Sequence, residues 1–223
     1  VRISEDGEIL VRNDGVFVGY YKNPEATERA LRGGYYHTGD AGVRDKGHLI
    51  YFDRVDEMIQ LSGGKKFSPQ FIEIRLRFSP YIKDAWVIGD RRDHLSAVMC
   101  IDYSVVSNWA DQRKLNYTSY QELSQMPEVY ELVEKQIRQA NKDLPDVAKI
   151  RKFTNLYKEL DADDDELTRT RKLRRAFVEK RYKEILDALY SKKDSVHIDT
   201  LIKYEDGRQA HIVTDMRIIP ITD

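Results

Sequence analysis

The pattern of this sequence changes near Asp56, and that change limits the folds open to the chain. Before Asp56 the residues favour short strands and turns, whereas after it strand-like runs alternate with helical ones. The first part holds too few strands to close a barrel or a sandwich, which implies that its partners are missing. We therefore expect an α+β chain, with a partial β-rich piece over residues 1–56 and a mixed α/β domain over residues 57–223.

Local signals locate the elements of the first part. Asn23-Pro24 places a capping residue before a proline at the first helical position, so a short helix should run to about Leu31 and stop at Gly33-Gly34. β-branched and aromatic residues between turn signals predict strands at residues 8–12, 16–21 and 48–52.

The second part combines strands with amphipathic helices. In residues 127–143 the side chains of Val129, Val133 and Ile137 share one helical face, and residues 174–190 repeat such a face, so two long helices are expected. Strand-like residues around the turn at 205–208 predict a C-terminal hairpin of residues 196–204 and 210–219. The other expected elements are a helix at 69–78, strands at 58–61, 85–88 and 95–103, and a helical insertion between 104 and 141.

Composition limits the functions that the whole chain can have. With 37 basic and 38 acidic residues its net charge is −1, which gives no overall field to attract nucleic acid or an anionic membrane. No apolar run could span a bilayer and no signal segment is visible, so any membrane contact would be peripheral. The single cysteine, Cys100, lies in an apolar run and should be buried, which fits a reducing, cytoplasmic setting. The histidines lack metal-ligand spacing, so no metal site is predicted.

Thr38-Gly39-Asp40 is the first candidate binding segment. A glycine before an acid, on a turn between strands, suits a place where a carboxylate accepts two hydroxyl hydrogen bonds, as a ribose diol offers. Alone, the tripeptide fits an ordinary turn better. Together, however, residues 7–12, 19–27 and 34–40 closely resemble the adenylate-forming superfamily of acyl-CoA synthetases and related ligases. In that family the matching aspartate binds both ribose hydroxyls of ATP or the acyl adenylate, a role that the resemblance gives to Asp40.

A second block that resembles the family begins at Asp53. The resemblance implies that Arg54 contacts the ribose or phosphate of the nucleotide, a task suited to a planar, permanently charged group. It makes Asp56 the hinge about which the C-terminal domain swings between adenylate-forming and thioester-forming positions. Many members have glycine in place of Asp53, a departure that restricts the backbone without removing the Arg54 contact. The alternative is a surface ion-pair cluster before a strand.

The loop Gly63-Gly64-Lys65-Lys66 follows the hinge. It lacks the Gly-Lys-Ser/Thr ending of a phosphate loop, and by itself it is a turn with a solvated charge pair. In the family this loop lines the tunnel for the pantetheine arm of CoA. Gly63 and Gly64 are therefore candidate CoA-binding residues, with Lys65 and Lys66 as neighbours of phosphate.

Residues 167–175 resemble the family's C-terminal lysine motif and make Lys172 the catalytic lysine. Its ammonium would balance the charge that develops between the attacking carboxylate and the α-phosphate. Arg169 replaces the usual proline, and Arg171 stands where shorter-chain members have glycine, so a less rigid loop is expected. By composition alone a solvated basic helix start is favoured. A nucleic-acid surface fits poorly, because the aromatic residues of 169–181 share the apolar helical face.

The resemblance as a whole implies the C-terminal portion of an AMP-forming long-chain acyl-CoA synthetase. Such an enzyme converts a fatty acid, ATP and CoA into acyl-CoA, AMP and pyrophosphate through an acyl adenylate, with Mg²⁺. The Mg²⁺ ligand, the phosphate loop and the acyl pocket would belong to a missing N-terminal large domain upstream of Val1, so this chain alone is expected to be inactive. Two alternatives stay open: a non-catalytic lid or binding module that acts on a separate subunit, and a nucleic-acid-binding domain.

Overall fold

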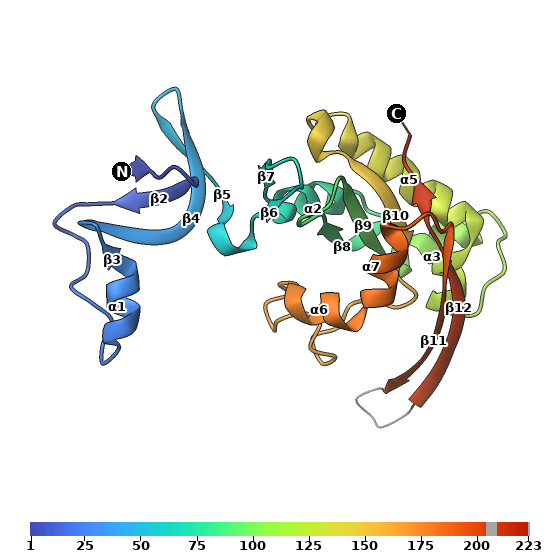
Figure 1. The fold of residues 1–223 in the computed structure, drawn as a ribbon. Coiled ribbons are helices and arrows are strands. Elements are labelled where there is room, and N and C mark those ends of the chain that lie inside the picture. Colours follow the sequence, from blue (N-terminus) through green and yellow to red (C-terminus); the bar gives the residue numbers. More distant parts are fainter. Residues whose placement is uncertain (204–208, 223) are drawn as a thin grey trace.

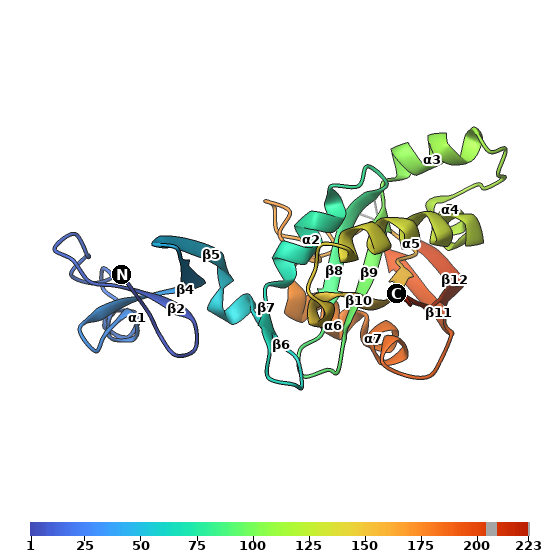
Figure 2. The same cartoon turned by 90° about the horizontal axis from the view of Figure 1, so that it is seen from above.

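The computed structural model describes residues 1–203 and 209–222. It has a β-rich N-terminal segment and a larger α/β body, as Figure 1 shows. A short connection around the 3-10 helix η1 (Val55–Glu57) joins the two (Figure 2). This arrangement agrees with the mixed fold class expected from the sequence.

The N-terminal segment is an antiparallel sheet with one helix. Its strands follow the spatial order β1-β2-β4-β3, with β5 paired to β4. The helix α1 (Pro24–Ala30) begins as predicted, because the Asn23 side chain accepts a hydrogen bond from the Ala26 N–H at 3.0 Å. The strands are β1 (Arg2–Ile3), β2 (Glu8–Val11), β3 (Leu31–Arg32), β4 (Tyr35–Asp45) and β5 (His48–Arg54).

The strand expected at residues 16–21 is wrong, because this stretch is a loop. The Val18 side chain is 98% exposed, so its hydrophobicity has no sheet to cover. The Tyr20 N–H donates to the Thr27 hydroxyl at 2.9 Å, a partner that lies on α1 and not on a neighbouring strand. Strand-like composition alone does not provide a pairing partner.

The body is built on a sheet with the strand order β13-β10-β9-β8 within the described residues. The β9 and β10 strands are parallel, and the other neighbours are antiparallel. Side chains alternate between the two faces, so Ala97 and Met99 enter one core while Val98 and Cys100 enter the other. The strands are β8 (Ile82–Ile88), β9 (Leu95–Ile101), β10 (Ile150–Asn155) and β13 (Ile219–Pro220).

Helices cover both faces of this sheet. The first core packs against α2 (Pro69–Arg77) and the helical insertion, whose helices are α3 (Tyr103–Asp111), α4 (Tyr120–Gln125) and α5 (Pro127–Asn141). The predicted helices at 69–78 and 127–143 are thus confirmed. The strand expected to reach residue 103 ends at Ile101, because the Asp102 carboxylate caps α3 by accepting the Val105 N–H at 3.1 Å. Small elements complete this side: β6 (Ile59–Gln60), β7 (Lys66–Phe67) and the 3-10 helix η2 (Asp146–Ala148).

The single helix expected over 174–190 is wrong. The chain forms α6 (Arg175–Arg181) and α7 (Lys183–Leu189), which are separated at Tyr182. Tyr182 is buried in the second core, and its hydroxyl donates to the buried carboxylate of Glu166. The predicted apolar face was correct. The contact between Tyr182 and the distant Glu166 occurs at the residue where the helix is interrupted.

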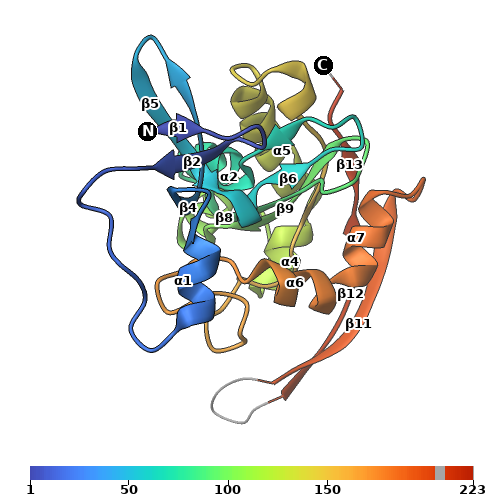
Figure 3. The same ribbon diagram turned by 60° about the vertical axis from the view of Figure 1, so that its left-hand side comes forward.

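The predicted C-terminal hairpin is present as β11 (Ser195–Lys203) and β12 (Gln209–Arg217). It extends from the side of the body that carries α7 (Figure 3). The turn expected at 205–208 lies outside the described residues.

Candidate functional site

Asp40 and Arg54 are direct partners on the neighbouring strands β4 and β5. The Arg54 Nη1 atom donates to Asp40 Oδ1 at 2.9 Å and to the Thr38 carbonyl oxygen at 2.8 Å. The hydrogen bond to Asp40 raises the pKa of Arg54. The arginine side chain is 51% exposed and that of Asp40 35% exposed, so both charged groups stay accessible to a ligand.

Thr38-Gly39-Asp40 lies inside β4, which corrects the expected turn between strands. The pairing with β2 is irregular here, because Glu8 faces Ala41 while Leu10 already faces His37. Gly39 has φ +72°, and a Cβ atom there would lie 2.5 Å from Arg54 Nη2. A glycine is therefore required both for the backbone conformation and for the close approach of the arginine.

Glu8 supports this irregular pairing of β2 with β4, and the sequence reasoning missed it. Its buried carboxylate accepts the Gly39 N–H at 2.8 Å and lies 2.7 Å from His37 Nδ1. An acid at the start of an otherwise apolar strand was the available signal. Its contacts cannot be inferred from sequence, since they depend on the pairing of β2 with β4.

The segment before the hinge is tied to the first helix after it. The Asp53 side chain is 2% exposed and accepts the Arg54 N–H at 2.8 Å and the Ser68 hydroxyl at 2.7 Å. Ser68 is in turn the N-cap of α2 and accepts the Phe71 N–H at 3.1 Å. Where many family members have glycine, this chain thus has a carboxylate that links β5 to α2.

A cleft of about 850 Å³ lies beside Asp56, the predicted hinge residue. The exposed Lys172 and Asp56 both line it, so the predicted catalytic lysine and the predicted hinge residue share one site. Asp40 and Arg54 are not among its described lining residues, although Arg54 Nε lies 3.9 Å from Asp56 Oδ1. The remaining lining comes from Glu57, Met58, Ile59, Asp90, Thr168 and the segment from Leu173 to Phe177 with Glu179.

Arg175 connects the elements around this cleft. Its Nη2 atom lies 2.7 and 2.8 Å from the two carboxylate oxygens of Glu73, and its Nε atom lies 3.2 Å from Glu57 Oε2. Glu73 also accepts the Val87 N–H at 2.8 Å. Burial raises the pKa of Glu73, and the charge of Arg175 opposes that rise. The pair links α2, β8 and α6 beside the cleft.

A tight turn carries Lys172 at the edge of the cleft. The Arg171 N–H donates to the Thr168 carbonyl at 2.8 Å, and the Thr168 N–H donates to the Lys172 carbonyl at 2.7 Å. The Lys172 N–H donates to the Thr168 hydroxyl at 3.0 Å. The loop that was expected to be less rigid is therefore closed by three hydrogen bonds.

The glycine loop lies between β6 and β7 and does not contribute to the described lining of the cleft. The Gly64 N–H donates to the Leu61 carbonyl at 2.8 Å, and the Leu61 N–H donates to the Lys65 carbonyl at 3.0 Å. Gly63, Gly64 and Lys65 thus form a compact hairpin that is separate from the Lys172 turn. The structure brings Lys172 and Asp56 together, but not Lys172 and this loop.

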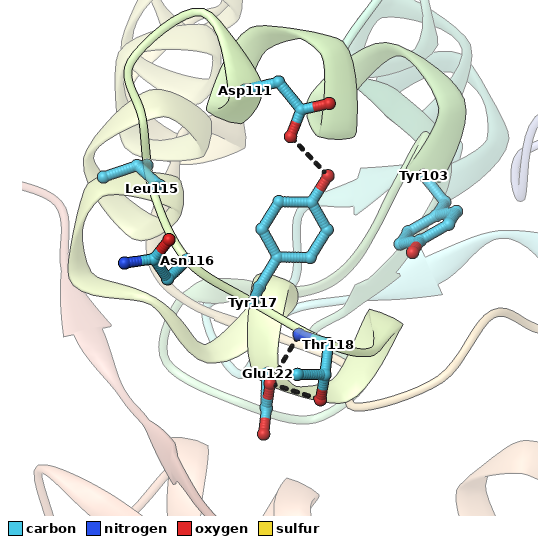
Figure 4. A pocket seen from close by; sticks show the side chains of 7 residues that line it. All are labelled: Tyr103, Asp111, Leu115, Asn116, Tyr117, Thr118 and Glu122. Atoms are coloured by element: carbon cyan, nitrogen blue, oxygen red, sulfur yellow. Dashed lines mark hydrogen bonds between the residues drawn. The ribbon is translucent and has the colours of Figure 1, made fainter.

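A second cleft, of about 490 Å³, lies in the helical insertion (Figure 4). The Tyr117 hydroxyl donates to Asp111 at 3.0 Å, and Thr118 donates to Glu122 through its N–H at 2.7 Å and its hydroxyl at 2.8 Å. These polar groups therefore satisfy one another, and the residues predicted for the site lie elsewhere.

Cys100 is buried and unpaired as expected, and burial raises the pKa of its thiol. In residues 1–203 and 209–222, no group of three or more His, Cys, Asp or Glu side chains could hold a metal ion. Over the same described ranges, no helix is both long and apolar enough to cross a membrane.

Residues 56–194, more than half of the chain, match the family described as AMP-binding enzyme C-terminal domain. The chain belongs to this family. The matched range includes both Asp56 and Lys172.

Known proteins agree with this assignment. The long-chain-fatty-acid–CoA ligase FadD15 of Mycobacterium tuberculosis is 34% identical over 195 residues, which make up 86% of this chain and 32% of that ligase. Long chain acyl-CoA synthetase 1 of Arabidopsis thaliana is 33% identical over 201 residues, 86% of this chain and 30% of that protein. The chain thus spans about a third of the length of these curated relatives.

Solved structures share the fold. The adenylation domain of a carboxylate reductase from Mycobacterium chelonae is similar with a TM-score of 0.65 and 28% identity, over 82% of this chain and 27% of that one. The adenylation domain of a carboxylic acid reductase from Segniliparus rugosus, solved with AMP and a carboxylic acid, gives a TM-score of 0.63 at 23% identity. It covers 82% of this chain and 28% of that one, and it supports the fold alone.

Proposed function

We propose that this chain is the C-terminal part of a long-chain fatty acid:CoA ligase, which forms acyl-CoA, AMP and pyrophosphate from a fatty acid, ATP and CoA. The main support is the cleft that both Lys172 and Asp56 line, with the Asp40–Arg54 pair directly before that hinge. The names of relatives 34% and 33% identical to the chain support the same activity.

Lys172 is assigned to adenylate formation. In this step a carboxylate oxygen of the fatty acid attacks the α-phosphorus of ATP, and the bond to pyrophosphate breaks as the new P–O bond forms. An ammonium group beside the reacting atoms stabilises the negative charge that they share in the transition state. On the nucleotide side, Asp40 would accept the two ribose hydroxyls and Arg54 would contact ribose or phosphate.

The glycine loop is assigned to thioester formation. Here the CoA thiol loses its proton and its sulfur attacks the acyl carbonyl carbon; the C–S bond forms as the acyl C–O bond to the phosphate breaks, and AMP leaves. Gly63 and Gly64 carry no side chains that would block the pantetheine arm, and Lys65 offers a cation to the phosphates of CoA. Because Lys172 and this loop lie at separate places on the body, rotation about Asp56 would bring each in turn to the acyl group.

A large domain would supply the acyl pocket, the phosphate loop and the ligand for Mg²⁺, which we do not assign to residues of this chain. It would also cover the apolar side chains that β5 exposes, among them Leu49, Tyr51 and Phe52. In the alternative arrangement, this chain is a stand-alone lid that acts on a separate subunit. The two arrangements differ in whether the lid is covalently joined to the large domain, and not in chemistry.

Nucleic-acid binding by the basic block at 169–181 has less support. Arg171 pairs with Asp84, Arg175 with Glu73, and Arg181 approaches Glu166. Arginines engaged with acids of the same chain have less charge to offer to phosphates.

The test separates the two half-reactions in the complete ligase polypeptide. Lys172→Ala should lower fatty-acid-dependent exchange of pyrophosphate into ATP by about 10²–10³-fold, the usual loss for a group that stabilises transition-state charge. Acyl-CoA formation from a synthetic acyl adenylate should change little. Lys180→Ala is the matched control, because Lys180 is an exposed lysine on α6 that does not line the described cleft.

Two results would contradict the proposal: an unchanged exchange rate in Lys172→Ala, or pyrophosphate release by the 223-residue chain alone. Adding the chain to a separately produced large domain tests the stand-alone alternative. Recovery of exchange in that mixture would favour the lid acting on a separate subunit.

A further inference from the structure

The turn that carries Lys172 contains an arginine in an uncommon backbone conformation. Arg171 has φ +59°, in the left-handed region that few residues other than glycine adopt. Two backbone hydrogen bonds impose this conformation: the Arg171 N–H donates to the Thr168 carbonyl, and the Thr168 N–H donates to the Lys172 carbonyl. They define a three-residue hairpin loop whose last position is left-handed. Glycine would meet this demand without steric strain, whereas arginine adopts this conformation at a cost.

The Arg171 side chain reaches a buried acid on the central sheet. Its Nη2 atom donates to Asp84 Oδ2 at 2.7 Å, and Asp84 lies on β8 with a side chain only 8% exposed. Burial raises the pKa of Asp84, and the charges of Arg171 and Arg77 oppose that rise. Arg77 is the more distant of these two cations, at 3.9 Å from Asp84 Oδ1. An exposed surface turn is thus attached to a mostly buried strand.

We propose that Arg171 is a positioning residue for Lys172. Its guanidinium ties the left-handed turn to Asp84, so the next residue in the chain, Lys172, stays at the edge of the cleft that Asp56 also lines. The tether compensates for a backbone conformation that arginine disfavours, and it replaces the restriction that a proline at position 169 would have given. This inference rests on the proposed function, since it assumes that Lys172 acts in adenylate formation.

The variant Arg171→Gly isolates the tether from the backbone. Glycine accepts the left-handed conformation but has no side chain to reach Asp84, so the turn can form and is no longer attached to β8. In the complete ligase polypeptide we expect the kcat for adenylate formation to fall about tenfold, as expected for a displaced catalytic group. The KM for ATP and the rate of thioester formation from a synthetic acyl adenylate should stay within about twofold, because neither depends on the place of Lys172.

Asp84→Asn tests the other end of the tether and should lower adenylate formation to a similar extent. The double variant with Arg171→Gly should be no slower than the worse single variant, because both changes remove one interaction. Arg171→Lys keeps a cation without the planar fork and should recover part of the rate. The matched control is Arg77→Gln, which changes the charge near Asp84 but leaves the Lys172 turn attached, and it should keep the full rate.

Hydrogen exchange of the amides from Thr168 to Lys172 gives a readout apart from activity. It should become faster in Arg171→Gly and stay unchanged in Arg77→Gln. Full adenylate formation in Arg171→Gly or Asp84→Asn would overturn the inference, and so would equal losses in both half-reactions or an equal loss in Arg77→Gln. If Lys172→Ala itself keeps its exchange activity, the proposed function fails first. If only Arg171→Gly is unaffected, the tether alone is wrong.

Discussion

The N-terminal segment and the α/β body differ in how their apolar side chains are covered. In the body, Trp86, Ile137 and Phe153 are at most 1% exposed, and one core lies on each face of the sheet. In the N-terminal segment, the side chains of β5 from Leu49 to Phe52 are 40–55% exposed. The body is therefore stabilised by its own residues, whereas β5 leaves apolar side chains exposed on both of its faces.

The two regions also hold their proposed site residues differently. Asp40 and Arg54 are cross-strand neighbours, so one hairpin is enough to bring them together. Lys172 depends on contacts from far along the chain, since its turn is attached to Asp84 and Arg175 reaches Glu73. The Asp40–Arg54 pair should thus tolerate loss of the body, whereas the Lys172 turn requires the folded sheet.

The largest expected effect breaks the core of the body. Phe153→Ala removes a ring that is fully buried on β10, and it should lower the free energy of unfolding by about 3–5 kcal/mol because a cavity remains. Phe52→Ala removes the same ring from a 41% exposed site and should change it by less than about 1 kcal/mol. Urea unfolding of both variants followed by circular dichroism measures the contrast. Equal losses would mean that the exposed β5 face is already covered in solution.

A smaller effect is expected at the link between the two regions. Asp53→Ala leaves the Ser68 hydroxyl and the Arg54 N–H without their buried acceptor, a loss of about 1–3 kcal/mol. Hydrogen exchange should show faster opening at the start of α2, whose N-cap is Ser68. Asp45→Ala, at the exposed end of β4, is the control and should leave those amides unchanged. Unchanged exchange in Asp53→Ala would show that the two regions are not coupled through this carboxylate.

Local sequence signals were sufficient to predict elements whose stabilising contacts lie within a few residues along the chain. The Asn23 cap with Pro24 predicted the start of α1, because capping involves residues three positions apart. The helix expected at 69–78 also begins at Pro69, and the structure adds Ser68 as its cap. The predicted strand at 16–21 failed because strand pairing is non-local. The predicted single helix over 174–190 failed at Tyr182, whose hydroxyl donates to Glu166.

The same distinction applies to the candidate site. The family motifs predicted Asp40, Arg54, Asp56 and Lys172. In the structure Asp40 contacts Arg54, and Asp56 and Lys172 line one cleft, while the roles of these residues stay predictions. Glu8 and Asp84 were missed, because their partners are 29 or more positions away along the chain. At Arg171, which by the resemblance stands where shorter-chain members have glycine, the sequence led us to expect only a less rigid loop. The left-handed backbone and the contact with Asp84 were not predicted.

The smallest expected effect is a pH dependence in the helical insertion. Hydrogen bonds from the Thr118 hydroxyl and N–H lower the pKa of Glu122 below its ordinary value of 4.5. A carboxyl group whose pKa is lower in the folded state adds stability that is complete above the unfolded value, and that stability is lost as the pH falls through the folded value. Amides near Thr118 should therefore exchange faster, relative to the intrinsic rate, as the pH drops below 4.5. Glu122→Gln should remove this pH dependence, and its persistence in that variant would assign it to another acid.

The pKa of Asp6 is also lowered, next to the Ser4 hydroxyl, so amide exchange in the N-terminal segment should depend on pH in the same direction. Asp6→Asn tests whether both regions respond alike.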